Sequence, residues 1–411
     1  MNNIYDILKE RGFIEGVTDE DGLHALLGSK EITCYIGFDP TAASLHVGSL
    51  IPIMSLVHMQ RMGHRPIALV GGGTVLIGDP SGKNEMRQIL SLAEVDKNAK
   101  GIKRQLSQYL DFSADKALLL NNADWLVPLN YIEFLRDIGR HFSVNRMLTA
   151  ESYRSRLETG LNFVEFNYML LQAYDFLHLY RKQECLLQMG GSDQWGNIVA
   201  GTDLIRRVEG GVAHGMVFPL ITTASGDKMG KTAQGAVWLD PKLTSPYEYY
   251  QYWINTDDRD VERFLALFTF LPLEEVKRYG RLTGADLREA KEVLAFEATT
   301  ITHGAEEAQR AREASRMAFG NEQGSLEAMS TTSVDKGRLK KGLVAFELFA
   351  ETGLCASKGD AKRLISQGGA YVSSRRIQDV DEVISEADFQ EGSVVLRAGK
   401  KRFHRVVVKK G

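Results

Sequence analysis

The sequence predicts an α/β protein that contains a parallel β-sheet, then an all-helical region, then a small basic α+β module. Apolar runs without polar alternation recur between helical patterns up to residue 222, as expected of parallel strands covered on both faces. Residues 245–320 show helical periodicity alone. The last seventy residues mix short strand and helix patterns with many basic side chains. We expect domains at 1–222, 223–320 and 342–411, with 321–341 as a linker.

Strands and helices are expected to alternate in the first region. The apolar run 32–38 predicts the first strand, and the spacing of Leu50, Ile53, Met54 and Val57 predicts a helix over 48–62. A ligand should bind at the C-terminal ends of parallel strands. The other strands are predicted at 66–71, 117–120, 185–189 and 217–222, and the other helices at about 94–110, 131–140 and 163–180, with one more that ends at Arg207.

Length and composition indicate a soluble globular protein. The 411 residues allow two or three domains, the formal net charge is −3, and no apolar run reaches membrane-spanning length. Residues 1–13 lack the apolar core of a signal peptide. Cys34, Cys185 and Cys355 lie far apart without a C-x-x-C spacing, which argues against a disulfide framework or a structural zinc site. We therefore expect a cytoplasmic protein without a membrane partner.

The charge is distributed unevenly along the chain. Residues 336–411 carry 16 Lys and Arg against 9 Asp and Glu, a net charge of +7, and residues 1–335 carry 34 against 44, a net charge of −10. Such a division indicates that one end handles a polyanion and the other performs specific chemistry. A basic surface that is only solvated would give the same pattern.

The segment 35–49 joins the first strand to the helix that follows, through a turn that contains Pro40. A helix start of this kind is a natural seat for a phosphate, because its unpaired N–H groups and the helix dipole favour an anion. His46 and Ser49 add an imidazole and a hydroxyl around Gly48, which allows a ligand to approach closely. A structural histidine is the commoner explanation of such a short match.

Three other loops each follow a predicted strand. The glycine-rich loop 71–83 is not a P-loop, and its Asp79 is either a turn residue or a carboxylate aimed at a substrate ammonium group. Gly190 and Gly191 form a second close-approach surface, with Ser192 or Asp193 as the N-cap of the next helix. Loop 224–232 presents Lys228 and Lys231 around Gly230, and in isolation such a loop is simply exposed and mobile.

Tyr168, Gln172 and Asp175 share one face of the predicted helix 163–180, because they are four and three residues apart. A phenol, an amide and a carboxylate are costly to bury without partners. The stripe therefore either faces solvent or lines a polar pocket.

Together, His46-Val47-Gly48-Ser49 and Lys228-Met229-Gly230-Lys231-Thr232 resemble the HIGH and KMSKS signatures of class I aminoacyl-tRNA synthetases. Segments 35–41, 78–82, 168–175 and 190–197 resemble those of the bacterial tyrosyl group, and the resemblance covers essentially the whole chain. It implies a Rossmann-like nucleotide-binding sheet and a two-step reaction. Tyrosine would attack the α-phosphate of ATP to give tyrosyl-adenylate and pyrophosphate, and the adenylate would then acylate the 3′ end of tRNA-Tyr.

The resemblance also assigns roles to residues. His46, helped by Thr41, would contact the α-phosphate, and Mg²⁺ would accompany ATP, with no permanently bound cofactor. The pyrophosphate would be bound by Lys228, Lys231 and Thr232, assisted by Lys83 and Arg87. ATP and its ribose would be framed by Gly37, Asp39, His46, Gly48, Ser49, Gly191, Asp193 and Lys231.

Specificity for tyrosine is implied in the same way. Tyr35 and Asp175 would hydrogen-bond the phenol of L-tyrosine, and its ammonium would be held by Asp79, Tyr168 and Gln172. Gln194 would lie close to the bound substrate. Phenylalanine would be rejected because a buried acceptor would lack a partner, a selectivity for which tyrosyl-tRNA synthetases are themselves the standard example. No editing domain is expected.

The basic module resembles a small RNA-binding domain named after a ribosomal small-subunit protein. Its expected contacts are to backbone phosphates of the variable arm or anticodon stem of tRNA-Tyr, through Lys358, Lys362, Arg363, Arg375 and Arg376. Family members are homodimers, and the interface is expected in an insertion near 112–147.

Two positions depart from the class I signatures. Ser49 stands where many members have His or Asn, with Pro52 in the helix behind it, and Gly230-Lys231-Thr232 replaces Ser-Lys-Ser. Two other interpretations remain open. A tryptophanyl-tRNA synthetase would share the fold but lack the Tyr35 and Asp175 pair and the RNA-binding tail. A non-catalytic RNA-binding relative would have no need of His46, Lys228 and Lys231.

Overall fold

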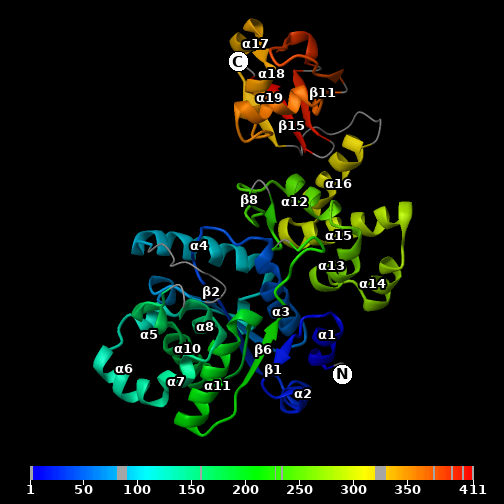
Figure 1. The fold of residues 1–411 in the computed structure, drawn as a ribbon. Coiled ribbons are helices and arrows are strands. Elements are labelled where there is room, and N and C mark those ends of the chain that lie inside the picture. Colours follow the sequence, from blue (N-terminus) through cyan, green and yellow to red (C-terminus); the bar gives the residue numbers. More distant parts are fainter. Residues whose placement is uncertain are drawn as a thin grey trace. The chain divides into compact units, whose positions relative to one another are not determined.

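The computed structural model describes residues 3–80, 90–157, 160–226, 228–232, 235–319, 330–373, 375–389, 392–399 and 402–409. The chain forms two compact units (Figure 1). The first consists of Met1–Gly230 and Glu262–Arg278, and the second of Lys231–Val261 and Tyr279–Gly411. The division therefore falls eight residues after the boundary expected at 222, and part of the helical region belongs with the sheet.

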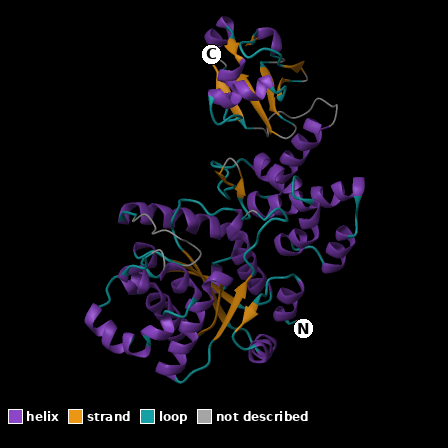
Figure 2. Ribbon diagram, in the orientation of Figure 1, coloured by secondary structure: helices purple, strands orange, loops and turns teal. Residues whose placement is uncertain are grey.

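Within the described residues, the first unit is built on a six-stranded sheet with the strand order β1-β6-β5-β2-β3-β4 (Figure 2). Only β1 is antiparallel to its neighbour. The strands are Gly16–Val17 (β1), Thr33–Phe38 (β2), Arg65–Val70 (β3), Leu118–Asn121 (β4), Cys185–Gly191 (β5) and His214–Phe218 (β6). The predicted parallel sheet is confirmed. Its order reverses direction between β2 and β5, and at such a switch point the C-terminal strand ends border a crevice for ligands.

Helices cover both faces of this sheet. Because parallel crossovers are right-handed, α3 and α4 lie on one face, and α10 and α11 lie on the opposite face. This double cover explains why β2, β3, β5 and β6 are buried almost throughout. Pro52 fits into α3 because it occupies the first turn, where the backbone N–H has no intrahelical acceptor. The four helices are Leu50–Arg61 (α3), Leu92–Tyr109 (α4), Tyr168–Gln183 (α10) and Trp195–Glu209 (α11).

Two of the predicted elements differ in the structure. The helix expected at 163–180 is interrupted, because the Tyr153 hydroxyl donates to the Phe166 carbonyl at 2.8 Å and accepts from the Met169 N–H at 3.2 Å. It forms Phe163–Phe166 (α9) and then α10. The last strand expected at 217–222 is His214–Phe218, since this segment pairs with both β5 and the unpredicted edge strand β1.

The remaining helices of the first unit are short. Arg11 ties the N-terminal helix to the end of α13, because its guanidinium donates to the carbonyls of Ala266, Thr269 and Leu271 at 2.9, 3.1 and 2.6 Å. These helices are Ile4–Glu10 (α1), Glu20–Ser29 (α2), Ala123–Leu126 (α5), Tyr131–Asp137 (α6), Val144–Met147 (α7), Glu151–Leu157 (α8), Val261–Phe268 (α13) and Leu273–Gly280 (α14), the last two of which extend slightly into the second unit.

The second unit contains the helices Pro246–Ile254 (α12), Leu287–His303 (α15) and Ala305–Phe319 (α16), preceded by the hairpin Lys231–Thr232 (β7) and Gly235–Ala236 (β8). Its C-terminal part has a core of its own, which includes Phe349, Ile377 and Leu396. There, a five-stranded sheet with the order β12-β11-β14-β15-β9 is found among the described residues. Its strands are Thr331–Val334 (β9), Ala370–Val372 (β11), Arg375–Arg376 (β12), Ser393–Ala398 (β14) and Arg402–Val408 (β15).

The linker predicted at 321–341 is too long. Residues 331–334 form β9, which pairs with β15, and Lys336–Lys341 forms α17. Both elements therefore belong to the C-terminal module, which also contains Leu343–Val344 (β10), Ala345–Glu351 (α18), Lys358–Ser366 (α19) and Val383–Ile384 (β13). Residues 321–329 lie outside the described part of the chain. A search of the described helices finds none with the length and apolarity to cross a membrane.

Candidate active site

The first signature lies between β2 and α3. His46 caps the short 3-10 helix Val47–Ser49, and its Nδ1 accepts the backbone N–H of Gly48 at 3.0 Å. Because Nδ1 accepts, the neutral imidazole carries its proton on Nε2. Ser49 precedes α3 and is half-buried, and Thr41 is exposed in the loop before His46. The sequence thus places an oriented N–H donor at the C-terminal end of the central strand.

The backbone of the second signature packs against the first. Met229 is buried and its N–H donates to the Ile221 carbonyl at 3.1 Å, while Thr222 and Lys228 form a β-bridge at the base of the loop. A Cβ on Gly230 would lie 3.0 Å from the Gly48 nitrogen and 3.5 Å from His46 Nδ1. Gly230 also has a φ of 78°, which a side chain disfavours. This close approach accounts for glycine where other class I signatures carry serine.

Some of the predicted phosphate-binding residues cannot be placed. Lys83 and Arg87 lie outside the described residues, and so do the side chains of Lys231 and Thr232, whose backbone forms β7 of the second unit. Their roles remain predictions.

The polar stripe of α10 is turned away from solvent, since Tyr168 and Asp175 are buried and Gln172 is half-buried. Asp175 is 2% exposed, and its carboxylate accepts from Asn122 Nδ2 at 2.9 Å and from Trp125 Nε1 at 2.7 Å. Tyr35 is 1% exposed, and no described group lies within hydrogen-bonding distance of its hydroxyl. Burial raises the pKa of Asp175 to about 7, and burial together with the Asp175 charge raises the pKa of Tyr35. An unpaired buried hydroxyl beside a buried carboxylate suits a ligand that carries its own hydroxyl.

Asn122 connects this carboxylate to the loop after β3. Its Oδ1 accepts the Gly73 N–H at 2.7 Å, and its Nδ2 also approaches Thr74 Oγ1 at 3.0 Å. Thr74 in turn donates to Asp39 Oδ1 at 3.2 Å, and the Tyr168 hydroxyl lies 3.5 Å from Asp39 Oδ2. Sequence reasoning missed Asn122 and Trp125. The available signal was that both follow the predicted strand 117–120 directly.

A second cluster of polar side chains surrounds Asp79, which is 7% exposed. Its carboxylate accepts from Gln194 Nε2 at 2.8 Å. Asn197, which is also buried, donates to Gln172 Oε1 at 3.0 Å and to Gln194 Oε1 at 3.1 Å. The structure thus brings together Asp79 and Gln172, which were predicted at the substrate ammonium, and Gln194, which was predicted to lie close to the substrate. They come from the loop after β3, from α10 and from the 3-10 turn before α11. Asn197 was not predicted, because one polar residue in an amphipathic helix carries no distinguishing pattern.

The glycines at the strand ends leave the sheet edge open. Gly37 is exposed in an otherwise buried strand, and a Cβ there would meet nothing within 4 Å. A Cβ on Gly191 would lie 2.5 Å from Asp193 Oδ1. Burial and the Asp79 charge raise the pKa of Asp193, and the Lys228 charge lowers it, so the second signature contributes to the potential at this edge. The expected N-cap is wrong, because α11 begins at Trp195 without a side-chain cap and Asp193 lies in a preceding 3-10 turn.

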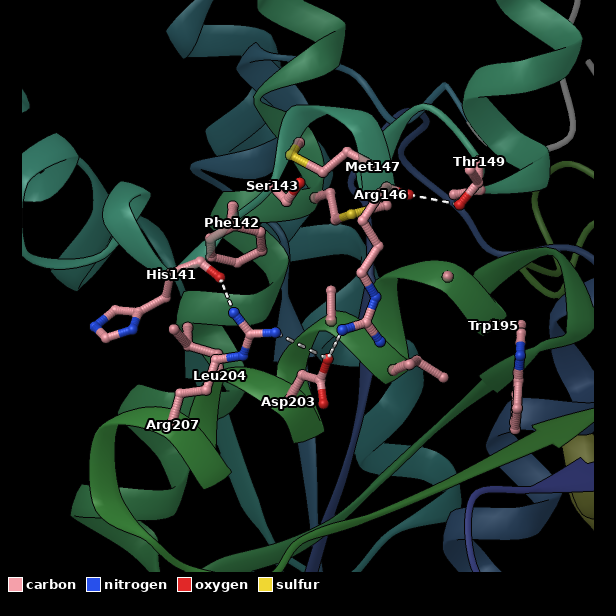
Figure 3. Close-up of a pocket in the computed structure, with 15 residues that line it drawn as sticks. His141, Phe142, Ser143, Arg146, Met147, Thr149, Trp195, Asp203, Leu204 and Arg207 are labelled. Atoms are coloured by element: carbon pink, nitrogen blue, oxygen red, sulfur yellow. Dashed lines mark hydrogen bonds and ion pairs between the residues drawn. The ribbon is translucent and has the colours of Figure 1, made fainter.

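A cavity of about 250 Å³ lies away from these residues, between the segment 141–150 and α11 (Figure 3). Arg146 and Arg207 both point toward Asp203, with Arg146 Nη1 at 2.5 Å and Arg207 Nη2 at 3.9 Å from Asp203 Oδ2. None of the predicted tyrosine- or ATP-binding side chains lines this cavity. It is therefore separate from the candidate active site.

In the C-terminal module, the predicted RNA-binding side chains are exposed. Lys358 pairs with Glu347 at 2.6 Å, Lys362 lies 4.2 Å from the centre of the Phe346 ring, and Arg363 pairs with Asp360. Arg375 bridges Glu382 and Asp388 and therefore supports the module internally. The guanidinium of Arg376 lies directly over Gly368, beyond the end of α19, so strand β12, which pairs with β11, lies next to the basic helix α19.

A doubly covered parallel sheet, with a histidine donor, glycine turns and buried polar side chains at its switch point, defines an α/β enzyme of the nucleotide-binding class. Residues 28–320 match the family described as tRNA synthetases class I (W and Y), and residues 322–406 match the tyrosine–tRNA ligase SYY-like C-terminal domain. The chain belongs to the class I tRNA synthetase family of the tryptophan and tyrosine enzymes.

Relatives match over the full length. The chain is 59% identical to a tyrosine–tRNA ligase of Desulfatibacillum aliphaticivorans over 99% of both chains, and 55% identical to one of Clostridium botulinum over 99% of this chain and 100% of the relative. Among solved structures, a C-terminally truncated mitochondrial tyrosyl-tRNA synthetase of Aspergillus nidulans has a TM-score of 0.71 and 31% identity, over 78% of this chain and 95% of that chain. An Archaeoglobus fulgidus tyrosyl-tRNA synthetase, with 18% identity over 74% of this chain and 99% of that chain and a TM-score of 0.58, supports the fold alone.

Proposed function

We propose that the chain is a tyrosine–tRNA ligase, which activates L-tyrosine with ATP and transfers the tyrosyl group to the 3′ end of tRNA-Tyr. The single observation that carries this choice within the family is the buried pair at the end of the pocket. Asp175 is held by two donors, and the Tyr35 hydroxyl has no partner among the described residues. A phenol hydroxyl would donate to the carboxylate and accept from Tyr35.

This arrangement also explains selectivity. Phenylalanine would bury the Asp175 carboxylate and the Tyr35 hydroxyl without supplying a partner, and an unsatisfied buried polar group costs roughly 1–3 kcal/mol, more if charged. Tryptophan would bring an indole N–H to a different place on a larger ring. Asp79 and the amides that surround it would bind the ammonium of the amino acid, close to Tyr168.

We further propose that ATP binds with Mg²⁺ along the open edge formed by Gly37, Gly191 and Asp193. Attack on the α-phosphate requires positioning and neutralisation of charge more than proton transfer. The Nε2 proton of His46 would be donated to the α-phosphate, and Lys228 and Lys231 would stabilise the departing pyrophosphate. Such donors accelerate the reaction where they bind the transition state more strongly than the substrate.

Tyrosine-dependent exchange of pyrophosphate into ATP tests the proposal. We expect exchange with tyrosine, none with tryptophan, and loss of at least about 100-fold in rate for His46→Ala or Lys231→Ala. His24→Ala and Lys242→Ala, which change exposed residues that have no assigned role in the site, serve as matched controls and should leave the rate unchanged. Exchange that tryptophan supports and tyrosine does not would overturn the assignment.

We propose that the C-terminal module binds tRNA-Tyr through Lys358, Lys362, Arg363 and Arg376, with Arg375 in the supporting role given by its two carboxylate partners. Because phosphate contacts supply most of such affinity, Lys362→Ala and Arg376→Ala should weaken tRNA binding and flatten its salt dependence. Adenylate formation should not change. A filter-binding titration at several salt concentrations checks this, and Arg375→Ala should in addition lower the melting temperature.

We also propose a cytoplasmic homodimer. Large apolar side chains are exposed within the expected interface, where Tyr131, Ile132 and Val144 are 55, 70 and 56% exposed. Further exposed apolar side chains follow it in the chain, among them Phe163 and Val164 at 67 and 48%. Exposed apolar patches of this kind favour a protein interface. Sedimentation velocity should show a dimer, and Phe163→Asp should shift it toward the monomer. The three buried free cysteines are compatible with a reducing compartment.

A further inference from the structure

The loop that carries Thr41 and His46 rests against one face of α4, which is cyan in Figure 1. Asn98, Gly101 and Gln105 lie at positions i, i+3 and i+7 of this helix and so share a face. Each of them meets the loop. Asn98 Nδ2 donates to the Pro40 carbonyl at 3.1 Å, Gly101 approaches Ala43, and Gln105 bonds to Ser44 and Leu45.

Gln105 makes the most specific of these contacts. Its side chain is 3% exposed in a helix whose other polar residues are mostly exposed. Oε1 accepts the Leu45 N–H at 2.7 Å, and Nε2 donates to Ser44 Oγ at 2.8 Å. Ser44 Oγ then donates to the Leu45 carbonyl at 2.7 Å. The amide of Gln105 therefore binds the Leu45 N–H and the Ser44 hydroxyl, in the two residues that precede His46, from sixty positions away.

Gly101 sets the distance between the helix and the loop. An ideal Cβ at this position would lie 2.1 Å from the Ala43 carbonyl oxygen, closer than real Cβ contacts allow. A glycine inside a helix costs about 1 kcal/mol relative to alanine. The close packing of α4 on the loop explains why glycine is nevertheless tolerated here.

We propose that Gln105 and Gly101 are positioning residues, which hold the loop so that His46 has the correct position for the attack of tyrosine on the α-phosphate. This inference rests on the proposed function and deepens it. The tyrosine pocket is built from β2, α10, α11 and the residues after β3 and β4, and α4 contributes none of the side chains assigned to it. A shift of the loop should therefore impair the chemical step and leave the binding of tyrosine intact.

The test uses the full-length chain with Gln105→Leu, which removes both hydrogen bonds at nearly constant volume, and Gly101→Ala, which retains the Gln105 side chain but pushes the loop away from α4. Gln108→Leu, at an exposed position of the same helix, is the matched control. Stopped-flow measurement of tyrosyl-adenylate formation gives the rate, and equilibrium dialysis of labelled tyrosine gives its Kd. Since a displacement of about 1 Å can cost about 100-fold in rate, we expect a 10- to 100-fold loss in both variants and none in the control.

The tyrosine Kd should stay within about twofold of the wild-type value. A lower rate with an unchanged Kd distinguishes a positioning role from a general disruption of the fold. Rates within twofold of wild type in both variants would overturn the proposal, and so would a parallel loss of rate and tyrosine affinity. If Gln105→Leu fails to fold, Gly101→Ala decides the question alone. A wild-type chain that forms no adenylate from tyrosine would instead refute the proposed function, so the two failures are distinguishable.

Discussion

Asp175 shows how one buried residue links stability to recognition. Its carboxylate lies in the interior, where burial raises its pKa to about 7 even though Asn122 and Trp125 donate to it. The ionised form accepts a phenol hydroxyl more strongly than the protonated form. Tyrosine affinity should therefore fall as the pH drops through 7, and isothermal titration calorimetry at several pH values would measure this loss.

The same raised pKa predicts a pH-dependent stability. The folded state holds a proton on Asp175 up to about pH 7, whereas the unfolded state releases it near pH 4, so this group lowers the free energy of unfolding as the pH rises between those values. The difference amounts to about 4 kcal/mol. In urea titrations, the free energy of unfolding of Asp175→Asn minus that of the wild type should increase as the pH is raised from 4 to 8. A difference that does not change with pH would contradict the buried ionisation.

Trp125 offers a more selective change at the same site. Its ring stacks on His178 with centroids 4.3 Å apart, and its Nε1 donates to Asp175. Trp125→Phe keeps an aromatic ring but removes the donor, and hydrogen bonds to charged groups contribute about 1.5–3 kcal/mol. We expect tyrosine to bind at least about tenfold more weakly at pH 7. Because the lost hydrogen bond lowers the pKa of Asp175, tyrosine affinity should also be lost at a higher pH than in the wild type. His178→Leu, which removes the stack and keeps the donor, should have the smaller effect in the same titration.

At the scale of elements, α1 and α13 depend on Arg11. Its guanidinium is 7% exposed and donates to three carbonyls just inside and beyond the end of α13, where helix carbonyls lack intrahelical partners. Arg11→Leu should lower the free energy of unfolding by about 3 kcal/mol or more, because these buried acceptors lose a charged donor. Chemical denaturation checks this. Lys9→Leu, an exposed change on the same helix that removes the ion pair to Glu20, should lower the free energy of unfolding much less.

At the scale of the whole molecule, the C-terminal module has its own sheet and core and includes β9 and α17. A truncation for functional study should therefore end before Ser330 rather than at Gly342, since a cut at 342 would leave one strand of the module without its partner. The truncated chain should form tyrosyl-adenylate at the wild-type rate and charge tRNA-Tyr poorly. Equal charging by both chains in an aminoacylation assay would contradict the RNA-binding proposal.

The amino-acid sequence by itself determined the class of fold and predicted several of the polar residues that the structure brings together. Uninterrupted apolar runs predicted the parallel strands, and the spacing of Tyr168 and Asp175 on one helix face left only a polar pocket or solvent. Both signals are local, because periodicity reports how a segment is buried. The interruption of the predicted helix by the Tyr153 hydroxyl came from a residue outside that helix, and no local pattern shows it.

Only the tertiary structure decided which polar groups meet. Asn122 and Trp125 reach Asp175 across fifty residues and more, Gln194 reaches Asp79 across 115, and Gln105 reaches the His46 loop across sixty. Each is a single polar residue without a repeating pattern around it. A hydrogen bond between distant residues depends on the packing of whole helices against the sheet, which brings donor and acceptor together only after the chain has folded.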